Sequence, residues 1–236
     1  MTRKAQTLGS LYTVTLAADA RFSKLNYAND QIWELQLNNA EPAANLLRTS
    51  FGLRAKNMRI FYRFQEGEDV VMHPEEYFQE AVIQKDYPNY TSISFYPFRD
   101  IKVIAEYWVP NSNIIAGKLH FHNMGGTPRS FQYELVSILN PAEGGNSIHP
   151  TKMNGVNILQ GASGGISPVI FSTGGPLGNT SPYPSLTHEI VLQPDQVRKL
   201  TWVQAAEVSA EKSFKLARAT AARNWDAEIS RLDMRQ

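Results

Sequence analysis

The chain has 236 residues, of which 42% are hydrophobic and 11% aromatic, values that are ordinary for a globular protein and argue against disorder. Its 23 Lys and Arg residues nearly balance 22 acidic residues, so the formal charge of +1 provides no long-range field that would attract nucleic acid or an anionic membrane. The absence of cysteine excludes disulfides, thiolate metal sites and a cysteine nucleophile.

The N-terminal region predicts a strand and not a secretion signal. Residues 11–16 alternate apolar and polar side chains, and no unbroken apolar run of signal-peptide length is present. Since no run of about 18 consecutive apolar residues occurs anywhere, no transmembrane helix is expected. We therefore expect a cytoplasmic protein that contacts no membrane.

Alternation of apolar and polar residues predicts β-strands along most of the chain. In residues 101–109 every second side chain is apolar, until Pro110 ends the run. Because no helical segment separates most of the strands, the pattern favours a large antiparallel β-sandwich over parallel βαβ units. A short helix is predicted at residues 74–80, and further strands at residues 11–16, 32–37, 58–64, 91–95, 117–123, 131–139, 156–159, 169–171, 186–192 and 198–205.

Residues 140–184 are rich in glycine, proline, serine and asparagine, with three Gly-Gly pairs. Loops of this length inside a compact domain are usually functional or hide short strands, and we expect both here. The glycine pairs fit neither the dinucleotide fingerprint nor the phosphate-binding P-loop, so no nucleotide cofactor is predicted.

The end of the chain changes character. Residues 209–235 predict one long helix that begins at Ser209 and carries a single apolar stripe. We therefore divide the chain into a β-sandwich domain, 1–208, and a helix, 209–236, that links it to a further domain; the alternative is a frayed terminal helix docked on the sheet. If the partner is a further domain, Trp225 on the stripe is expected to be partly exposed, packed on a second copy in a homodimer, or held by one side of the sandwich.

Candidate metal and catalytic residues are few. His120 and His122 alternate on one strand and share a face, as metal ligands do, but no third ligand is evident, so no metal site is predicted. The carboxylates, including Glu106 and Glu134, fall where solvated strand edges or helix starts explain them. No acid and base pair can be chosen from them, so no catalytic residue is predicted.

Aromatic residues offer the remaining binding chemistry, because sugar rings stack on exposed Trp and Tyr side chains. Tyr183, between Pro182 and Pro184 in the long loop, is the candidate carbohydrate-binding residue. Trp108 is a weaker candidate on the more polar face of its strand. For both residues the alternative is ordinary packing between elements.

Several segments resemble a known family, namely residues 26–33, 87–89, 95–98, 105–110 and 192–202. In texture and order they resemble the N-terminal β domain of bacterial glycoside hydrolases of the glucoamylase and glycogen-debranching type. The resemblance implies a supersandwich of the galactose-mutarotase-like type, followed by a linker helix and an (α/α)6 barrel that carries the general acid and base. It therefore implies a chain that is not catalytic alone. Its partners would be that barrel in the same polypeptide and an oligosaccharide or polysaccharide.

Two other functions remain open. A freestanding carbohydrate-binding module would explain the sandwich and the aromatic residues, but it leaves the long helix without a role. An aldose-epimerase-like enzyme would need a histidine acid and a glutamate base in one cleft, with the histidine drawn from His120, His122, His149 and His188.

Overall fold

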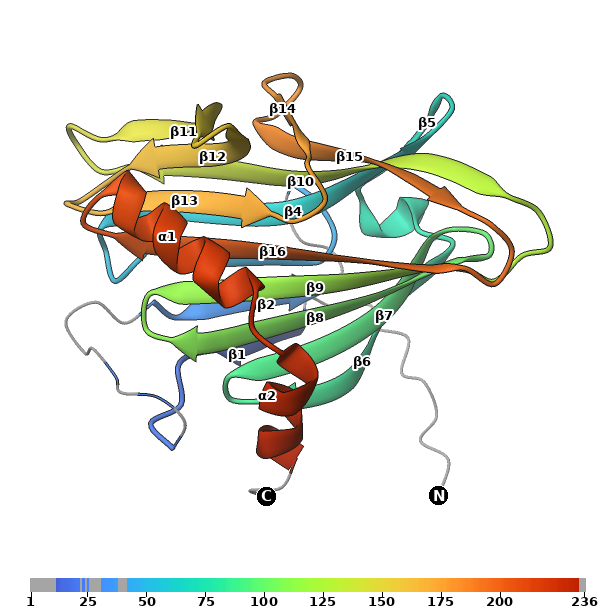
Figure 1. The fold of residues 1–236 in the computed structure, drawn as a ribbon, viewed down its shortest axis with the longest axis horizontal. Helices are drawn as coiled ribbons and strands as arrows, with labels where there is room; N and C mark the ends of the chain where they lie inside the picture. The colour runs from blue at the N-terminus through green and yellow to red at the C-terminus, as the bar shows by residue number, and fades with distance from the viewer. Residues whose placement is uncertain (1–11, 22, 24, 26–30, 38–41, 234–236) are drawn as a thin grey trace.

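The computed structural model describes residues 12–21, 23, 25, 31–37 and 42–233. Within this part of the chain, sixteen strands form two antiparallel sheets that face each other, and two helices follow the last strand (Figure 1). The expected fold, a mostly-β antiparallel sandwich, is confirmed. Residues 26–30 of the family resemblance lie outside the described residues.

Each sheet has eight strands. The first, sheet A, has the order β1-β2-β3-β4-β10-β15-β14, with β5 paired to β4, and the second, sheet B, has the order β11-β12-β13-β16-β9-β8-β7-β6. The strands of sheet A are β1 Tyr12–Leu16, β2 Trp33–Leu37, β3 Leu46–Thr49, β4 Ala55–Glu66, β5 Asp69–Val71, β10 Arg129–Pro141, β14 Leu177–Asn179 and β15 Ser185–Leu192. Those of sheet B are β6 Gln79–Tyr87, β7 Tyr90–Phe98, β8 Ile101–Asn111, β9 Ile114–Asn123, β11 Asn146–Met153, β12 Val156–Ala162, β13 Ser167–Ser172 and β16 Val197–Glu207.

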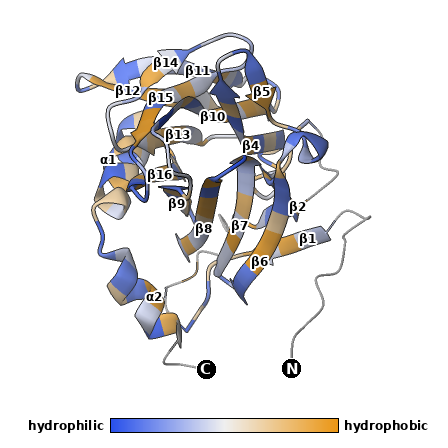
Figure 2. Ribbon diagram, turned by 90° about the vertical axis from the view of Figure 1, so that its right-hand side faces the viewer, coloured by the Kyte–Doolittle hydropathy of each residue, from blue (hydrophilic) through white to orange (hydrophobic). Residues whose placement is uncertain are grey.

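The main core lies between the two sheets. Side chains alternate along each strand, so one set points inward and the other faces solvent or the helices. Figure 2 shows hydrophobic and hydrophilic residues following one another along strands such as β6 and β7. Tyr62 of sheet A accepts a hydrogen bond from the Trp202 indole N–H of sheet B, at 3.2 Å, in the middle of this core. Gly117 lies so close to Trp202 that an added Cβ would be 2.2 Å from the ring. The sequence therefore uses glycine here to leave room for the indole.

Several strands were not predicted from the sequence. The glycine-rich segment 140–184 contains β11 and β14 in addition to the expected strands, so it does hide short strands. The helix expected at residues 74–80 is only a single 3-10 turn, Pro74–Glu76 (η1), after which the backbone is extended. The reason is packing, because the buried Tyr77 ring stacks on Phe95 with centroids 5.2 Å apart and holds the chain against the core.

The long C-terminal helix is in fact two helices, α1 Ala210–Ala221 and α2 Trp225–Asp233. Ser209 caps the first, as expected, with its hydroxyl accepting from the Lys212 N–H at 3.4 Å. The first helix ends before Asn224, whose side-chain oxygen accepts a hydrogen bond from the Ala227 N–H at 3.3 Å. Asparagine favours this capping role over a position inside a helix, which explains the break. Residues 234–236 lie outside the described part.

Both helices pack on the outer face of sheet B, and α1 crosses β13 and β16 (Figure 1). Trp225 of α2 is only 3% exposed, and its ring packs edge-on against Trp108 of β8 with centroids 5.4 Å apart. The apolar stripe thus packs on sheet B of this chain. Trp225 is held by one side of the sandwich and is not partly exposed. None of the described helices has the length and apolar character needed to cross a membrane.

Candidate functional site

Tyr183, the residue expected to bind carbohydrate, lies over the outer face of sheet A. It belongs to the loop between β14 and β15, and its half-buried ring packs edge-on against Phe61 of β4, with centroids 5.7 Å apart. The surrounding apolar side chains include Met72, Val136 and Ile138. The ring is therefore anchored on one side and reachable by solvent on another, so carbohydrate binding by Tyr183 remains a prediction.

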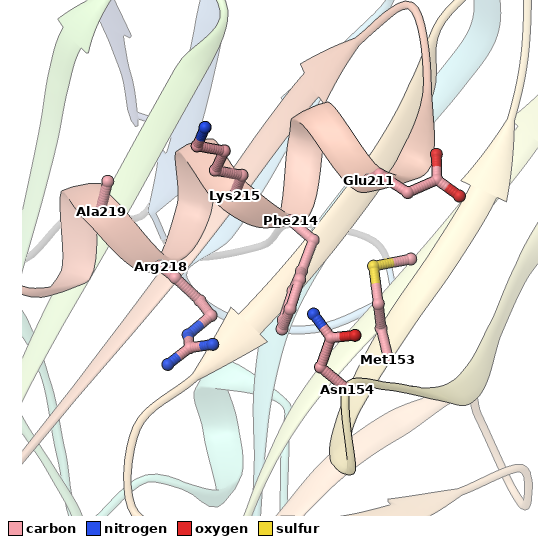
Figure 3. Close-up of a pocket in the computed structure, with 7 residues that line it drawn as sticks. All are labelled: Met153, Asn154, Glu211, Phe214, Lys215, Arg218 and Ala219. Carbon is pink, nitrogen blue, oxygen red and sulfur yellow. The ribbon is translucent and has the colours of Figure 1, made fainter.

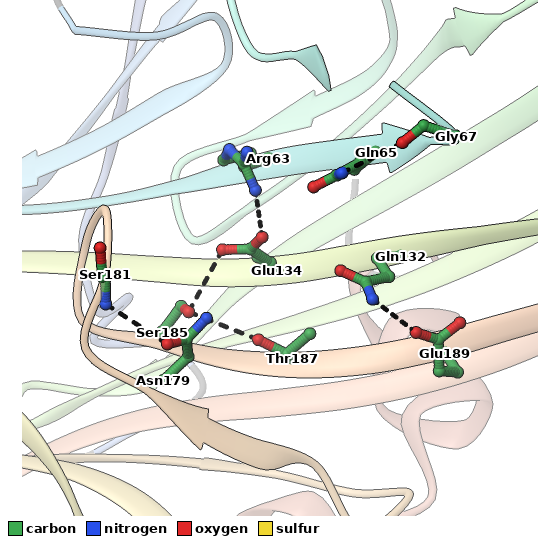
Figure 4. A network of polar contacts seen from close by, with 10 residues as sticks. All are labelled: Arg63, Gln65, Gly67, Gln132, Glu134, Asn179, Ser181, Ser185, Thr187 and Glu189. Carbon is green, nitrogen blue, oxygen red and sulfur yellow. Dashed lines mark hydrogen bonds and ion pairs between the residues drawn. The ribbon is translucent and has the colours of Figure 1, made fainter. Parts of the chain in front are cut away.

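A row of polar side chains runs across the same outer face, over β4, β10 and β15 (Figure 4). Arg63 and Glu134 form an ion pair whose side chains are only 13% and 4% exposed. The Ser185 hydroxyl donates to Glu134 at 3.3 Å, and Gln132 donates to Glu189 at 2.7 Å. The sequence interpretation of Glu134 as a solvated carboxylate is wrong, because β10 is an inner strand and Arg63 lies directly opposite Glu134.

On the outer face of sheet B, a second carboxylate is also partly buried. Glu106 of β8 accepts from the Tyr90 hydroxyl at 2.7 Å and is hydrogen-bonded to His120 Nε2 at 2.9 Å. Burial alone would raise the pKa of Glu106, but the hydrogen bonds from His120 and Tyr90, with the charge of Lys118, outweigh it and lower the pKa. Glu106 is therefore an ionised carboxylate fixed by hydrogen bonds, and it is not the solvated group expected from the sequence.

The histidines proposed for an epimerase do not gather in one cleft. His149 is exposed on β11, whereas His188 is buried and hydrogen-bonded to Ser172 Oγ at 3.0 Å. Burial, with the nearby Arg198 charge, lowers the pKa of His188 to about 4. His120 and His122 do share the outer face of β9, and within the described residues no group of three or more potential metal ligands gathers.

A groove of about 540 Å³ opens between α1 and the turn that joins β11 to β12. Figure 3 shows the Phe214 ring directed from α1 toward Met153 and Asn154 of that turn. The Arg218 guanidinium lies over the ring, 5.6 Å from its centroid. The groove is thus apolar at its base and charged at its rim. Sequence reasoning missed it because the two walls are distant along the chain.

Trp108, the weaker aromatic candidate, is covered by two side chains from the C-terminal segment. Trp225 packs against its ring, and the Arg223 guanidinium lies 4.8 Å from its centroid. Trp108 is only 4% exposed, so the packing interpretation is confirmed for this residue.

Two eight-stranded antiparallel sheets face to face define a large sandwich of the galactose-mutarotase-like type, as the sequence resemblance implied. No protein-family model matches the chain, and the search of curated proteins gives no significant match. A bacterial glucoamylase complexed with acarbose has a similar structure, with a TM-score of 0.57, 11% identity, and coverage of 92% of this chain and 39% of the glucoamylase.

Two further solved structures share the fold. A putative kojibiose phosphorylase from the human microbiome matches with a TM-score of 0.52 and 8% identity, over 81% of this chain and 29% of that one. A GalM/aldose epimerase homologue from C. elegans matches with a TM-score of 0.50 and 9% identity, over 84% of this chain and 99% of that one. This chain therefore spans well under half of the first two proteins and nearly all of the third. At these identities the likeness shows the fold alone.

Proposed function

We propose that the chain is the N-terminal, non-catalytic sandwich domain of a cytoplasmic glycoside hydrolase of the glucoamylase or glycogen-debranching type. In this role it supports an (α/α)6 catalytic barrel in the same polypeptide and shapes its substrate cleft. The observation that carries the proposal is the match of 92% of this chain to 39% of a bacterial glucoamylase, which leaves the larger part of that enzyme to other domains.

The pairing of the buried carboxylates supports the same proposal. Glycoside hydrolysis requires two carboxyl groups separated by roughly 5 to 9.5 Å across the scissile bond. Glu134 is instead held by Arg63, and Glu106 is held by His120 and Tyr90. The two carboxylates also lie on the outer faces of opposite sheets, so they cannot flank one glycosidic bond.

Two measurements test this proposal. The purified chain is expected to give no turnover of maltooligosaccharides, whereas turnover that is abolished by a single Asp or Glu substitution within it would refute the proposal. The genomic reading frame is the second test. Coding sequence for helical repeats beyond Gln236 would support a linked catalytic barrel, and a stop codon there would contradict it.

A second candidate function is carbohydrate binding by the outer face of sheet A. The observation that favours it is the half-buried Tyr183 ring on the same outer face as the polar row, so this face supplies both a stacking surface and hydrogen-bonding groups. Tyr183→Ala is expected to weaken maltotriose binding, measured by NMR titration. Tyr12→Ala removes a 41% exposed tyrosine elsewhere on sheet A and is the control. Equal losses in the two variants would contradict this function.

The aldose-epimerase alternative has one structural argument, the match to nearly the whole of the epimerase homologue. Its acid and base must each reach the bound sugar, yet His120 and Glu106 are hydrogen-bonded to each other at 2.9 Å. A mutarotation assay decides the question. Activity in the wild type that is lost when one of the candidate histidines, His120, His122, His149 or His188, is replaced by asparagine would favour the epimerase.

A further inference from the structure

Two arginines lie directly opposite each other on the outer face of sheet A. Arg48 of β3 pairs in register with Arg59 of β4, and their strand neighbours Leu47 and Ile60 point into the main core. Like charges at directly opposed cross-strand positions are destabilising unless something compensates for them. The pair is therefore unfavourable unless a negatively charged group lies beside it.

In the part of the chain that the structure describes, no carboxylate is bonded to either arginine. Among the described residues neither Arg48 nor Arg59 takes part in an ion pair, and the Arg59 Nε–H is buried without a hydrogen-bond acceptor. Glu34 lies opposite Arg48 on β2, but the two side chains are not in ion-pair contact. A buried guanidinium N–H without an acceptor is costly, so the arrangement suits an acceptor that comes from outside the chain.

A pocket opens beside Arg48, the partner of Arg59 in this pair. It has a volume of about 190 Å³ and is lined in part by Glu34, Arg48, Ser50 and Lys56. Its lining thus holds two cationic side chains, Arg48 and Lys56, and one carboxylate, Glu34, whereas Arg59 is outside the lining and lies directly opposite Arg48 on β4. The planar guanidinium matches the two oxygens of a carboxylate, sulfate or phosphate, which makes this pocket suited to an anionic group.

The arginine pair is next to the candidate sugar-binding residue. Arg59 and Phe61 are two positions apart on β4 and so share one face, about 7 Å apart along the strand. The Phe61 ring packs edge-on against the Tyr183 ring, with centroids 5.7 Å apart. A ligand on the Tyr183 ring can therefore extend along β4 toward Arg59 and across to Arg48 on β3.

We propose that the outer face of sheet A binds a carbohydrate that carries an anionic group, with the sugar against Tyr183 and the anion held by Arg48 and Arg59. The anionic group is a carboxylate, a sulfate or a phosphate. The inference rests on the carbohydrate-binding function proposed above for Tyr183 and adds the chemical class of the ligand.

NMR titrations with glucuronate, glucose 6-sulfate, glucose 6-phosphate and glucose test this proposal and distinguish the three anionic groups. At least one anionic sugar is expected to bind about tenfold or more tightly than glucose, since a charge-assisted hydrogen bond contributes roughly 1.5 to 3 kcal/mol. Arg48→Gln should abolish that preference, and because Arg48 is exposed this variant should fold. Lys102→Gln removes one positive charge from sheet B and is the matched control.

Three other outcomes would overturn the proposal or its assignment to the arginine pair. Equal binding of glucose and all three anionic sugars would overturn the proposal while leaving neutral carbohydrate binding at Tyr183 in place. Inorganic phosphate or sulfate that binds as tightly as the sugar derivatives would also overturn it, because the site would then hold an ion only. Equal losses in Arg48→Gln and Lys102→Gln would show general electrostatic attraction and overturn the assignment to the arginine pair.

Discussion

The contact between α2 and sheet B gives the sharpest test of the fold. Trp225→Ala removes a side chain that is 3% exposed and packs edge-on against Trp108. Burying a large apolar side chain contributes about 1.5 to 3 kcal/mol, and an edge-on aromatic pair adds about 0.5 to 1.5 kcal/mol. The exposed ion pair between Lys118 and Asp226, at 3.4 Å, adds little because Asp226 is 87% exposed.

We therefore expect Trp225→Ala to lower the free energy of unfolding by about 2 to 4 kcal/mol. The backbone amides of α2 should lose hydrogen-exchange protection, while those of β8 and β9 keep it, because a short helix packed on the outside of a sheet can open locally. Urea denaturation measures the first quantity and hydrogen exchange the second. The control is Phe78→Ala, which removes an aromatic ring that is 48% exposed and should cost much less.

A double-mutant cycle isolates the aromatic pair itself. Trp108→Ala combined with Trp225→Ala should show a coupling of about 0.5 to 1.5 kcal/mol. Strictly additive losses, or a loss in Trp225→Ala no larger than that in Phe78→Ala, would refute the argument that α2 is docked through this pair. The apolar stripe would then need a partner outside the described residues.

Three further outcomes follow from buried contacts. Gly117→Ala should destabilise the domain by about 3 kcal/mol in urea denaturation, because the new Cβ would be 2.2 Å from the Trp202 ring. Glu134→Ala should cost about 3 kcal/mol or more by leaving the Arg63 guanidinium buried and unpaired, and adding Arg63→Met should recover part of that loss. The pKa of His188 is lowered to about 4 from 6.5, so the unfolded chain binds the extra proton and stability should fall as pH drops from about 6.5 to about 4; His188→Asn should remove that part of the pH dependence in melting experiments.

Much of the fold could be predicted from local patterns. Alternation along residues such as 101–109 reports which side chains are buried, and the same signal repeated along the chain specifies an antiparallel sandwich. The signal fails where strands are short or rich in turn residues, as in β11 and β14, because only pairing with neighbouring strands makes these segments extended. It also fails at Asn224, where a local side-chain cap overrides a helical period that continues on both sides.

The sequence by itself determined the class of fold and the inward face of the predicted strands. Only the tertiary structure decided which polar groups meet. Arg63 and Glu134 are 71 residues apart, and Arg48 faces Arg59 through strand register alone. Register depends on the packing of whole sheets, and a slip of one residue turns every side chain to the opposite face. For that reason the ion pair and the arginine pair could not be read from the order of the residues.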